Sequence, residues 1–326
     1  MSAKGGWMAW SAKKKALIFG LVGLLIIALG VGLGVGLGLG LKNSGGGDES
    51  GGSGSGGNGS GNGGGSGSGN GNSTTGGNTT SIWQPKIGAK WQIELLYPLN
   101  DTSVDADIYD IDLFDSPNAT ITKLQGMGRK VICYFSAGTY ENWRKDAGEF
   151  NSSDLGDNLD DWPGEKWLDT NSQNVRRIMR QRLDLAQAKG CDGVDPDNID
   201  GYGNKNGLGL TQEDAIAYVK WLASQAHGRN MSLGLKNGGD IIGSVFDKMQ
   251  WSVNEQCAVY DECHLYSAFV NASKPVFHIE YPKGDDTNNN NSVSTNQRNS
   301  ACEATGAGNF STVIKNMDLD NWVEYC

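Results

Sequence analysis

Four aspartates stand close together in residues 190–201, which read GCDGVDPDNIDG. They are Asp192, Asp195, Asp197 and Asp200. Neighbouring carboxylates repel one another, so the group needs a metal ion, hydrogen-bond donors, water or a positively charged ligand to lower its energy. The spacing does not fit a calcium-binding EF-hand loop, because a loop that begins at Asp195 has Ile199 at position five and Asn206 at position twelve.

Other catalytic chemistries find little support in the chain. The histidines are few, namely His227, His264 and His278, and none lies near a serine nucleophile motif. Residues 82–326 contain neither a phosphate-binding loop nor a Cys-x-x-Cys pair, so nucleotide chemistry and a zinc centre are not favoured. We expect no cofactor and no metal. Two carboxylates on separate strands remain, which is what glycoside hydrolysis requires.

The elements that must position these carboxylates alternate between strand and helix. We predict eight strands, at Trp91–Leu95, Ile108–Leu113, Lys130–Phe135, Gly193–Asp197, Ser232–Lys236, Gln250–Asn254, Pro275–Tyr281 and Thr312–Lys315. Helical spacing of apolar residues predicts a helix over 174–188 and another that Thr211 caps. Their ends are marked by Lys189-Gly190 and His227-Gly228. The pattern predicts an α/β fold, a (β/α)₈ TIM barrel over residues 82–326.

Polar residues close most of the predicted strands. They are Asp112, Tyr134, Ser136, Asp195, Asp197, Asn198, Lys236, Asn237, Glu255, Glu280 and Tyr281. A TIM barrel carries its active site at the carboxyl ends of its strands, so these side chains are expected to meet at one mouth. We predict Asp197 and Glu255 as the catalytic pair, because the fourth and sixth strands face each other across the mouth, and we predict the others as substrate-binding residues.

The aspartates of residues 190–201 need not share one role. We expect Asp195 to assist substrate binding or orientation, and Asp192 and Asp200 to be structural. A lone aspartate at this place would rather cap a helix, but a second carboxylate in the same ring favours catalysis. Lys236 either bonds the nucleophile or a sugar hydroxyl, or is a charge partner for Asp197 in a stabilising network.

The segment after the third predicted strand, residues 137–170, is a long loop rich in aromatic residues. Long loops in compact domains are usually functional, and aromatic faces pack against sugar rings. The alternative is that the tryptophans Trp143, Trp162 and Trp167 fill a satellite core. We expect at least two of them to do so.

The N-terminal quarter has a different character. Residues 1–15 form a basic tail, residues 16–41 carry no charge and are long enough to cross a bilayer, and residues 42–81 form a Gly/Ser/Asn-rich flexible linker. The lysines before the apolar run predict a single-pass type II anchor in the plasma membrane, with the catalytic domain extracellular. A cleaved signal peptide is the competing interpretation, but no small-x-small cleavage site follows the apolar run.

Cysteines and sequons suit the secretory route. All six cysteines lie in residues 82–326, together with sequons at Asn118, Asn151, Asn230 and Asn271. We predict the disulfides Cys257–Cys263 and Cys302–Cys326. Cys133 and Cys191 either pair or stay as buried thiols. The net charge of −10 favours a cationic partner and disfavours nucleic acid, and we expect a monomer.

Five segments together resemble glycoside hydrolase family 114, the endo-α-1,4-polygalactosaminidases. They read VICYFSAGTYENWR, WPGEKWLDT, GCDGVDPDNIDGY, GLKN and WSVNEQC, and the likeness extends over roughly Trp83 to Tyr325. The predicted anchor and the Gly/Ser/Asn-rich linker also resemble the family's fungal, membrane-tethered members. The resemblance implies a barrel enzyme that cuts α-1,4-linked galactosamine in deacetylated regions of galactosaminogalactan. It also implies that the catalytic carboxylates are Asp197 and Glu255, with Asp195 as the alternative to Asp197.

A cationic substrate would explain the aspartate cluster, because the ammonium groups of galactosamine offset the repulsion between carboxylates. By analogy with other barrels we expect retaining hydrolysis, with Asp197 as nucleophile and Glu255 as acid and base. Two rivals stay open: a barrel enzyme of the α-galactosidase type acting on a neutral or acetylated galactoside, and a non-catalytic tethered lectin for cationic polysaccharide.

Overall fold

The computed structural model describes residues 82–285 and 287–326. The predicted tail 1–15, anchor 16–41 and linker 42–81 lie outside these residues. Among the residues that are described, no helix combines the length and the apolar character that a membrane crossing needs.

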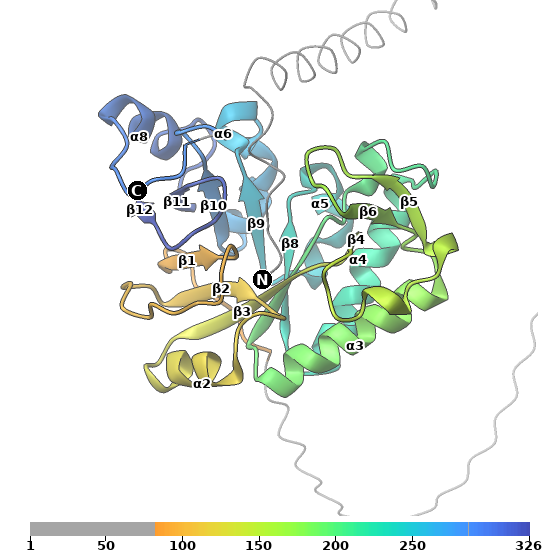
Figure 1. The fold of residues 1–326 in the computed structure, drawn as a ribbon. Coiled ribbons are helices and arrows are strands. Elements are labelled where there is room, and N and C mark those ends of the chain that lie inside the picture. The colour runs from red at the N-terminus through yellow and green to blue at the C-terminus, as the bar shows by residue number, and fades with distance from the viewer. Residues whose placement is uncertain (1–81, 286) are drawn as a thin grey trace, which may run out of the picture. The chain divides into compact units, whose positions relative to one another are not determined.

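In the described residues, eight parallel strands follow one another around a sheet in the order of the sequence (Figure 1). They are β1 (Trp91–Glu94), β2 (Ile108–Asp112), β3 (Lys130–Ser136), β7 (Gly193–Asp197), β8 (Ser232–Lys236), β9 (Trp251–Glu255), β10 (Val276–Glu280) and β11 (Ser311–Lys315). Each predicted strand is confirmed, with ends that differ by one residue at most. The sheet is the barrel-like α/β architecture that the sequence predicts.

Side chains close the seam between the first and last parallel strands. The Trp91 indole N–H donates to the Ser311 carbonyl at 2.8 Å, and Lys315 Nζ donates to Gln92 Oε1 at 3.1 Å. A short strand, β12 (Val323–Tyr325), pairs antiparallel with the outer edge of β11. The barrel therefore has one seam that is held mainly by side chains.

One part of the barrel core is an apolar cluster that contains the fully buried indoles of Trp91 and Trp251. The Trp251 indole lies over Gly234 on the neighbouring strand β8 and Gly193 on β7, the strand after that. A Cβ atom at Gly234 would stand 2.1 Å from Trp251 Nε1, and one at Gly193 would stand 2.5 Å from its Cη2. Both positions therefore need glycine, and the tryptophan fills the space that they leave.

Two long helices cover β7 and β8, namely α3 (Gln173–Lys189) and α4 (Gln212–His227). The Ser172 hydroxyl caps α3, and Gly190 ends it with φ 83°. Thr211 caps α4 as predicted, in a reciprocal box with Asp214. The other helices are shorter: α2 (Asn118–Gly126), α5 (Ile242–Val245), α6 (Cys257–Tyr260), α7 (Ser267–Asn271) and α8 (Thr295–Cys302). Single 3₁₀ turns lie at η2 (Ala147–Glu149), η3 (Ser152–Asp154), η4 (Gly201–Gly203), η5 (Gly239–Ile241), η6 (Phe246–Lys248) and η7 (Cys263–Tyr266).

The segment between β3 and β7 is not a plain loop, because it folds into a small antiparallel sheet. Its strands are β4 (Thr139–Glu141), β5 (Leu155–Asn158) and β6 (Glu165–Leu168), in the order β4-β6-β5. Trp167 of β6 is buried, whereas Trp143 is 48% exposed and Trp162 is 52% exposed. Our expectation that at least two of these tryptophans fill a satellite core is wrong, since the latter two lie in turns between the strands.

Three disulfides fix the described domain. Both predicted pairs are confirmed, Cys257–Cys263 and Cys302–Cys326. The pairing that the sequence left open is Cys133–Cys191, which joins β3 to the residues just before β7.

Candidate active site

Lys236, the last residue of β8, lies between two carboxylates from the strands on either side of it. Its Nζ is 3.0 Å from Asp197 Oδ1 at the end of β7 and 2.9 Å from Glu255 Oε2 at the end of β9. Burial alone would lower the pKa of Lys236, but the charges of Asp197 and Glu255 outweigh it and raise this pKa well above its ordinary value. The lysine is therefore a fixed positive charge that holds both carboxylates.

Two tyrosines complete the contacts of the pair. The Tyr134 hydroxyl donates to Asp197 Oδ2 at 2.7 Å, and the Tyr281 hydroxyl donates to Glu255 Oε1 at 2.5 Å. Burial disfavours the charge on Glu255, yet Lys236 and the Tyr281 hydrogen bond hold the pKa of Glu255 below its ordinary value. In the free protein Glu255 is thus an anion.

Asn237 orients Glu255 from both ends. Its Nδ2 donates to Glu255 Oε2 at 3.1 Å, and its Oδ1 accepts the Glu255 backbone N–H at 2.9 Å. The residue has φ 50°, a left-handed conformation that asparagine tolerates better than most residues. The structure therefore brings six predicted residues together: Tyr134, Asp197, Lys236, Asn237, Glu255 and Tyr281.

A cleft of about 450 Å³ opens beside Glu255, within the size range of ligand sites. Its lining comes from the connections that follow β7, β8 and β9, and includes the carboxylates of Asp200, Asp240, Glu255 and Glu262. Among the described residues that line it there is no lysine or arginine. Burial and the charge of Asp197 raise the pKa of Asp200 to about 6. The four carboxyl groups and the lack of a basic side chain among the described lining residues make the cleft acidic.

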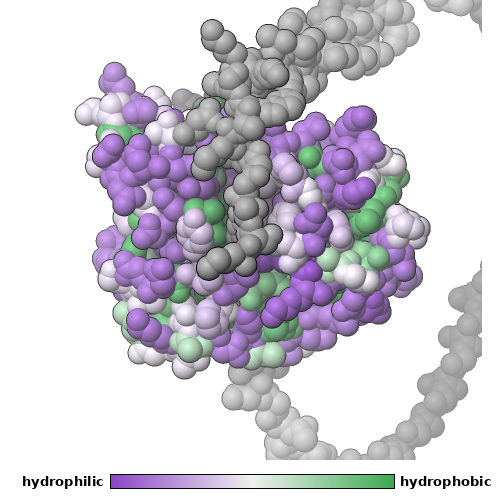
Figure 2. Space-filling view, in the orientation of Figure 1, coloured by the Kyte–Doolittle hydropathy of each residue, from purple (hydrophilic) through white to green (hydrophobic). Residues whose placement is uncertain are grey.

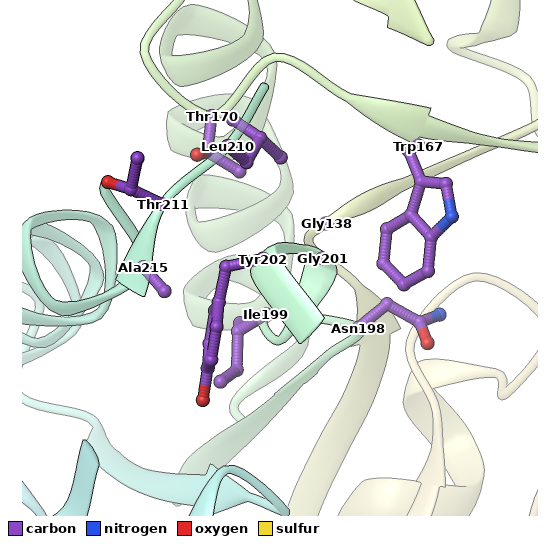
Figure 3. Close-up of a pocket in the computed structure, with 10 residues that line it drawn as sticks. All are labelled: Gly138, Trp167, Thr170, Asn198, Ile199, Gly201, Tyr202, Leu210, Thr211 and Ala215. Atoms are coloured by element: carbon purple, nitrogen blue, oxygen red, sulfur yellow. The ribbon is translucent and has the colours of Figure 1, made fainter. Parts of the chain in front are cut away.

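The wall of this cleft is braced from behind by the small sheet. Figure 3 shows Trp167 of β6 beside Asn198 and the η4 turn, which carries Gly201 and Tyr202. A Cβ atom at Gly201 would stand 3.0 Å from Trp167 Cε3, so the indole packs directly on this turn. Tyr202 also lines the cleft and bonds Asp240. The buried tryptophan thus supports the site indirectly.

Three predicted substrate-binding residues instead hold the small sheet and its surroundings. Asp112 forms a buried ion pair with Arg144 at 2.6 Å, which occupies its carboxylate. Asn198 Nδ2 donates to Thr139 Oγ1 at 3.0 Å. Ser136 is buried, and its carbonyl accepts from Arg182 at 2.6 Å. The structure does not bring these three side chains to the cleft.

Glu280 also differs from the prediction. It is 2% exposed, its Oε1 accepts the Ala258 backbone N–H at 2.9 Å, and the same oxygen lies 2.8 Å from His278 Nε2. Because side chains alternate along a strand, Glu280 and Tyr281 point to opposite faces of the sheet. Tyr281 reaches Glu255, and Glu280 fixes the start of α6.

Asp195 lies deeper than Asp197 on β7. It is fully buried, so it does not reach the cleft as a substrate-binding residue would. Asp195 and Asp110 on β2 influence each other's pKa. The structure therefore places Asp195 below Asp197, away from the cleft.

Two carboxyl groups near the site were missed by sequence reasoning. Glu165 is buried on β6, where its carboxylate accepts from Thr139 Oγ1 at 2.9 Å. Burial and the nearby charges of Glu141 and Asp197 raise the pKa of Glu165 to about 8. The second missed carboxyl group is that of Asp110. The sequence could have indicated it, because a charged residue stands at an inward position of the predicted strand Ile108–Leu113. Glu165 had no such signal, because its strand was predicted as loop.

The comparisons with known proteins agree with this geometry. Residues 72–326 match the family described as glycoside-hydrolase family GH114. The chain is 68% identical to Aspergillus fumigatus Ega3, solved in complex with galactosamine, over 76% of this chain and 99% of that chain, with a TM-score of 0.75. It shares the fold of the glycoside hydrolase domain of PelA from Pseudomonas aeruginosa, at 12% identity over 72% of this chain and 98% of that chain, with a TM-score of 0.53. No curated protein matches the chain.

The family match extends over most of the chain, and the identity to a solved relative is high over almost the whole of that relative. The resemblance stated from the five sequence segments is therefore confirmed. The protein is a glycoside hydrolase that belongs to family GH114.

Proposed function

We propose that this glycoside hydrolase cuts within chains of α-1,4-linked galactosamine, in the deacetylated regions of galactosaminogalactan. The observation that carries the proposal is the cleft beside Glu255, whose lining has four carboxylates and no basic side chain among the described residues. A polymer that bears ammonium groups gains Coulomb energy in such a cleft and offsets the repulsion between its carboxylates. The relative Ega3, solved with galactosamine, supports the same substrate class.

Hydrolysis in this proposal uses Asp197 and Glu255. Both carboxylates bond the same Lys236 nitrogen, at 3.0 and 2.9 Å, so the two bonded oxygens lie no more than about 6 Å apart. Retaining glycosidases place their carboxyl groups roughly 5 Å apart, and inverting enzymes need a wider gap for a water molecule. The short separation favours retention.

We assign Asp197 as the nucleophile and Glu255 as the acid and base. Tyr134 and Lys236 each form a hydrogen bond with the Asp197 carboxyl group and fix its orientation. Glu255 has the more exposed side chain, 25% against 13%, as fits a group that must reach the leaving sugar and then a water. A general acid must hold a proton, but Lys236 keeps Glu255 ionised in the free protein. The assignment therefore requires that Lys236 gives up its bond to Glu255 and bonds Asp197 alone once substrate is bound.

The first test is reducing-end release by residues 82–326 on partly deacetylated galactosaminogalactan and on its fully acetylated form. We expect release from the deacetylated polymer alone, and a loss of about 10⁴-fold in Asp197→Asn and in Glu255→Gln. Asp192→Asn is the matched control, because this carboxylate pairs with Lys130 away from the cleft. Release from the acetylated polymer would indicate that the substrate is a neutral or acetylated galactoside. Binding without release would indicate a non-catalytic lectin.

The second test separates the two roles. With azide present, Asp197→Ala should yield a β-glycosyl azide, because azide replaces the nucleophile on the face opposite the leaving group. On an activated aryl α-glycoside, whose leaving group needs no proton from Glu255, Glu255→Ala should yield the α-azide through the covalent intermediate. The opposite pair of products would exchange the two roles, and an inverted product from the wild type would exclude retention.

We further propose the membrane location. Residues 16–41 would anchor the chain in the plasma membrane as a type II protein, with the hydrolase outside. Three disulfides support an oxidising compartment, and the sequon asparagines Asn118, Asn151, Asn230 and Asn271 are exposed. We expect the full chain to stay in the membrane fraction at alkaline pH and to shift in mass after deglycosylation. Protease added to intact cells should remove the hydrolase domain, and protection of the domain would reverse the orientation.

We also propose that the hydrolase domain is a monomer that does not bind nucleic acid. Hydrophilic residues dominate the face seen in Figure 2, and hydrophobic ones are scattered over it. The net charge of −10 disfavours phosphate backbones. Light scattering on residues 82–326 should give the mass of one chain, and a mass of two would reveal an interface.

A further inference from the structure

Two carboxyl groups meet inside the barrel, below the proposed catalytic pair. Asp110 lies in the middle of β2 and Asp195 in the middle of β7, and both are fully buried. Of the charged groups that raise the pKa of Asp110, Asp195 has the strongest effect. In the part of the chain that the structure describes, no N–H or O–H group reaches any of their four oxygens. Both buried carboxyl groups therefore lack a hydrogen-bond donor among the described residues.

The contact spans the barrel interior. β2 and β7 are not neighbours, because β3 pairs with both of them. In a TIM barrel the inward side chains of alternate strands share one layer, which is what brings Asp110 to Asp195. Asp197 is two residues further along β7, on the same face, and so stands one layer nearer the mouth. The pair forms the floor beneath the proposed nucleophile.

The charged groups that face the pair come from three strands. Lys236 faces it from β8, Asp197 from β7 and Glu255 from β9. If Asp110 and Asp195 were both ionised, four carboxylates would surround one ammonium in a space with little water. Burial and the charges of Asp197 and Glu255 raise the pKa of Asp195 to about 7. Burial and the charges of Asp195 and Asp197 raise the pKa of Asp110 well above its ordinary value. One proton on the pair removes one of these four negative charges. It also supplies the O–H donor that the oxygens of Asp110 and Asp195 otherwise lack.

We propose that Asp110 and Asp195 hold one proton between them, in a carboxylic acid–carboxylate hydrogen bond, and that the pair is a positioning unit which keeps Lys236 charged between Asp197 and Glu255. Asp110 carries the proton and donates it to the Asp195 carboxylate. The single negative charge that remains stabilises the Lys236 ammonium from below. The pair touches no substrate, because neither residue is exposed.

The second half of this inference rests on the proposed roles of Asp197 and Glu255, whereas the shared proton does not depend on activity. The first experiment is therefore spectroscopic. The infrared spectrum of the wild-type domain at pH 7 should contain a carboxylic-acid C=O band that is lost in Asp110→Asn and in Asp195→Asn. Glu165→Gln identifies the acid band of Glu165, and Asp192→Asn is the control without an effect. A spectrum in which neither variant removes a band would overturn the shared proton.

The second experiment measures the pH profile of kcat and KM. Each single variant keeps one negative charge and gains an amide donor, so we expect kcat to fall by about threefold with little shift of the profile. The double variant Asp110→Asn/Asp195→Asn loses the charge and keeps the shape. Removing a negative charge lowers the pKa of every neighbouring group, so both limbs of its profile should move to lower pH, with kcat about tenfold lower and KM within twofold.

A purely structural role would lower the melting temperature of the double variant and leave its pH profile in place, which would overturn the positioning role. If the double variant fails to fold, the infrared spectra of the single variants still decide whether the proton is shared. If the wild type shows no hydrolase activity, the proposed function fails while the infrared result stands on its own.

Discussion

Two buried lysines end two strands of the same barrel and have opposite electrostatic states. Lys236 ends β8 with two carboxylates bonded to its nitrogen, which raise its pKa above the ordinary value. Lys315 ends β11, and its nitrogen donates instead to the neutral oxygens Gln92 Oε1 at 3.1 Å and the Asp320 carbonyl at 2.6 Å. Burial lowers the pKa of Lys315 to about 7, against the weaker attraction of Asp320 and Glu94.

Burial alone therefore does not decide the charge of an interior lysine, since both residues are less than 5% exposed. Lys236 stays charged because two carboxylates contact its nitrogen directly. Lys315 approaches neutrality because its nitrogen contacts neutral oxygens instead. The first arrangement is useful at a site that must organise anions. The second suits a seam, where the lysine serves as a hydrogen-bond donor.

The largest expected effect comes from Lys236→Met. It removes the cation that both carboxylates share, so we expect kcat to fall by about 10³-fold with the fold retained. The pKa of Glu255 should rise, because Lys236 is the main cause of its lowering, and the limb of the pH profile that reports Glu255 should move to higher pH. Steady-state kinetics over a range of pH measure both changes. Lys315→Met is the matched control, and an equal loss there would erase the distinction between the two lysines.

A smaller effect is expected from Tyr281→Phe. It deletes one hydrogen bond to a charged group, about 2 kcal/mol, so kcat should fall by about 10- to 50-fold with KM nearly unchanged. The shift of the Glu255 limb should have the same sign as in Lys236→Met and be smaller. Tyr202→Phe is the control, since its hydroxyl bonds Asp240 and not Glu255. A larger shift in Tyr281→Phe than in Lys236→Met would contradict the ranking.

Lys315→Met should change stability and its pH dependence. Its two acceptors lose their donor, so we expect the free energy of unfolding to fall by about 2 kcal/mol. Between pH 7 and pH 10.5 the unfolded chain holds a proton on Lys315 that the folded protein lacks, so the wild type gains stability as the pH rises through this window. The difference in melting temperature, wild type minus variant, should thus be larger at pH 9 than at pH 7. A constant difference would mean that Lys315 stays charged.

The smallest effect is expected from Glu94→Gln. Burial raises the pKa of Glu94 from 4.5 to about 7, so between these values the folded protein holds a proton that the unfolded chain lacks. The wild type therefore loses stability as the pH rises through this window, and the variant should lose less. We expect a change of about 2–4 °C in melting temperature between pH 5 and pH 7, and kcat within twofold. Calorimetry at the two pH values measures it, and a steeper loss in the variant would reverse the sign.

The barrel was predictable because each strand is a short apolar run between turn residues, and Gly190 and Thr211 mark helix ends by their own chemistry. The small sheet in residues 137–170 was not, since its strands are three or four residues long and carry no clear alternation. Its pairing depends on contacts with the turn after β7, which a local pattern does not contain.

The site residues show the same limit at the level of single side chains. Asp197, Lys236 and Glu255 are placed at adjacent strand ends, as the predicted strands imply. Glu280 and Tyr281 were both predicted as substrate-binding residues, although neighbouring residues of a strand point to opposite faces. A stricter use of the two-residue period would have placed only one of them at the site. Asp195 points to the same face of β7 as Asp197 but lies deeper in the barrel. This difference in depth depends on the barrel geometry, which the sequence pattern does not show.

The tryptophan that plugs the barrel has a consequence for how a polymer moves through the enzyme. Trp251 fills the interior over Gly193 and Gly234, so there is no passage along the barrel axis. A long chain must approach sideways across the strand ends and cannot be threaded. Both fragments leave on the side from which the chain came, and each encounter can begin at any interior position of the polymer.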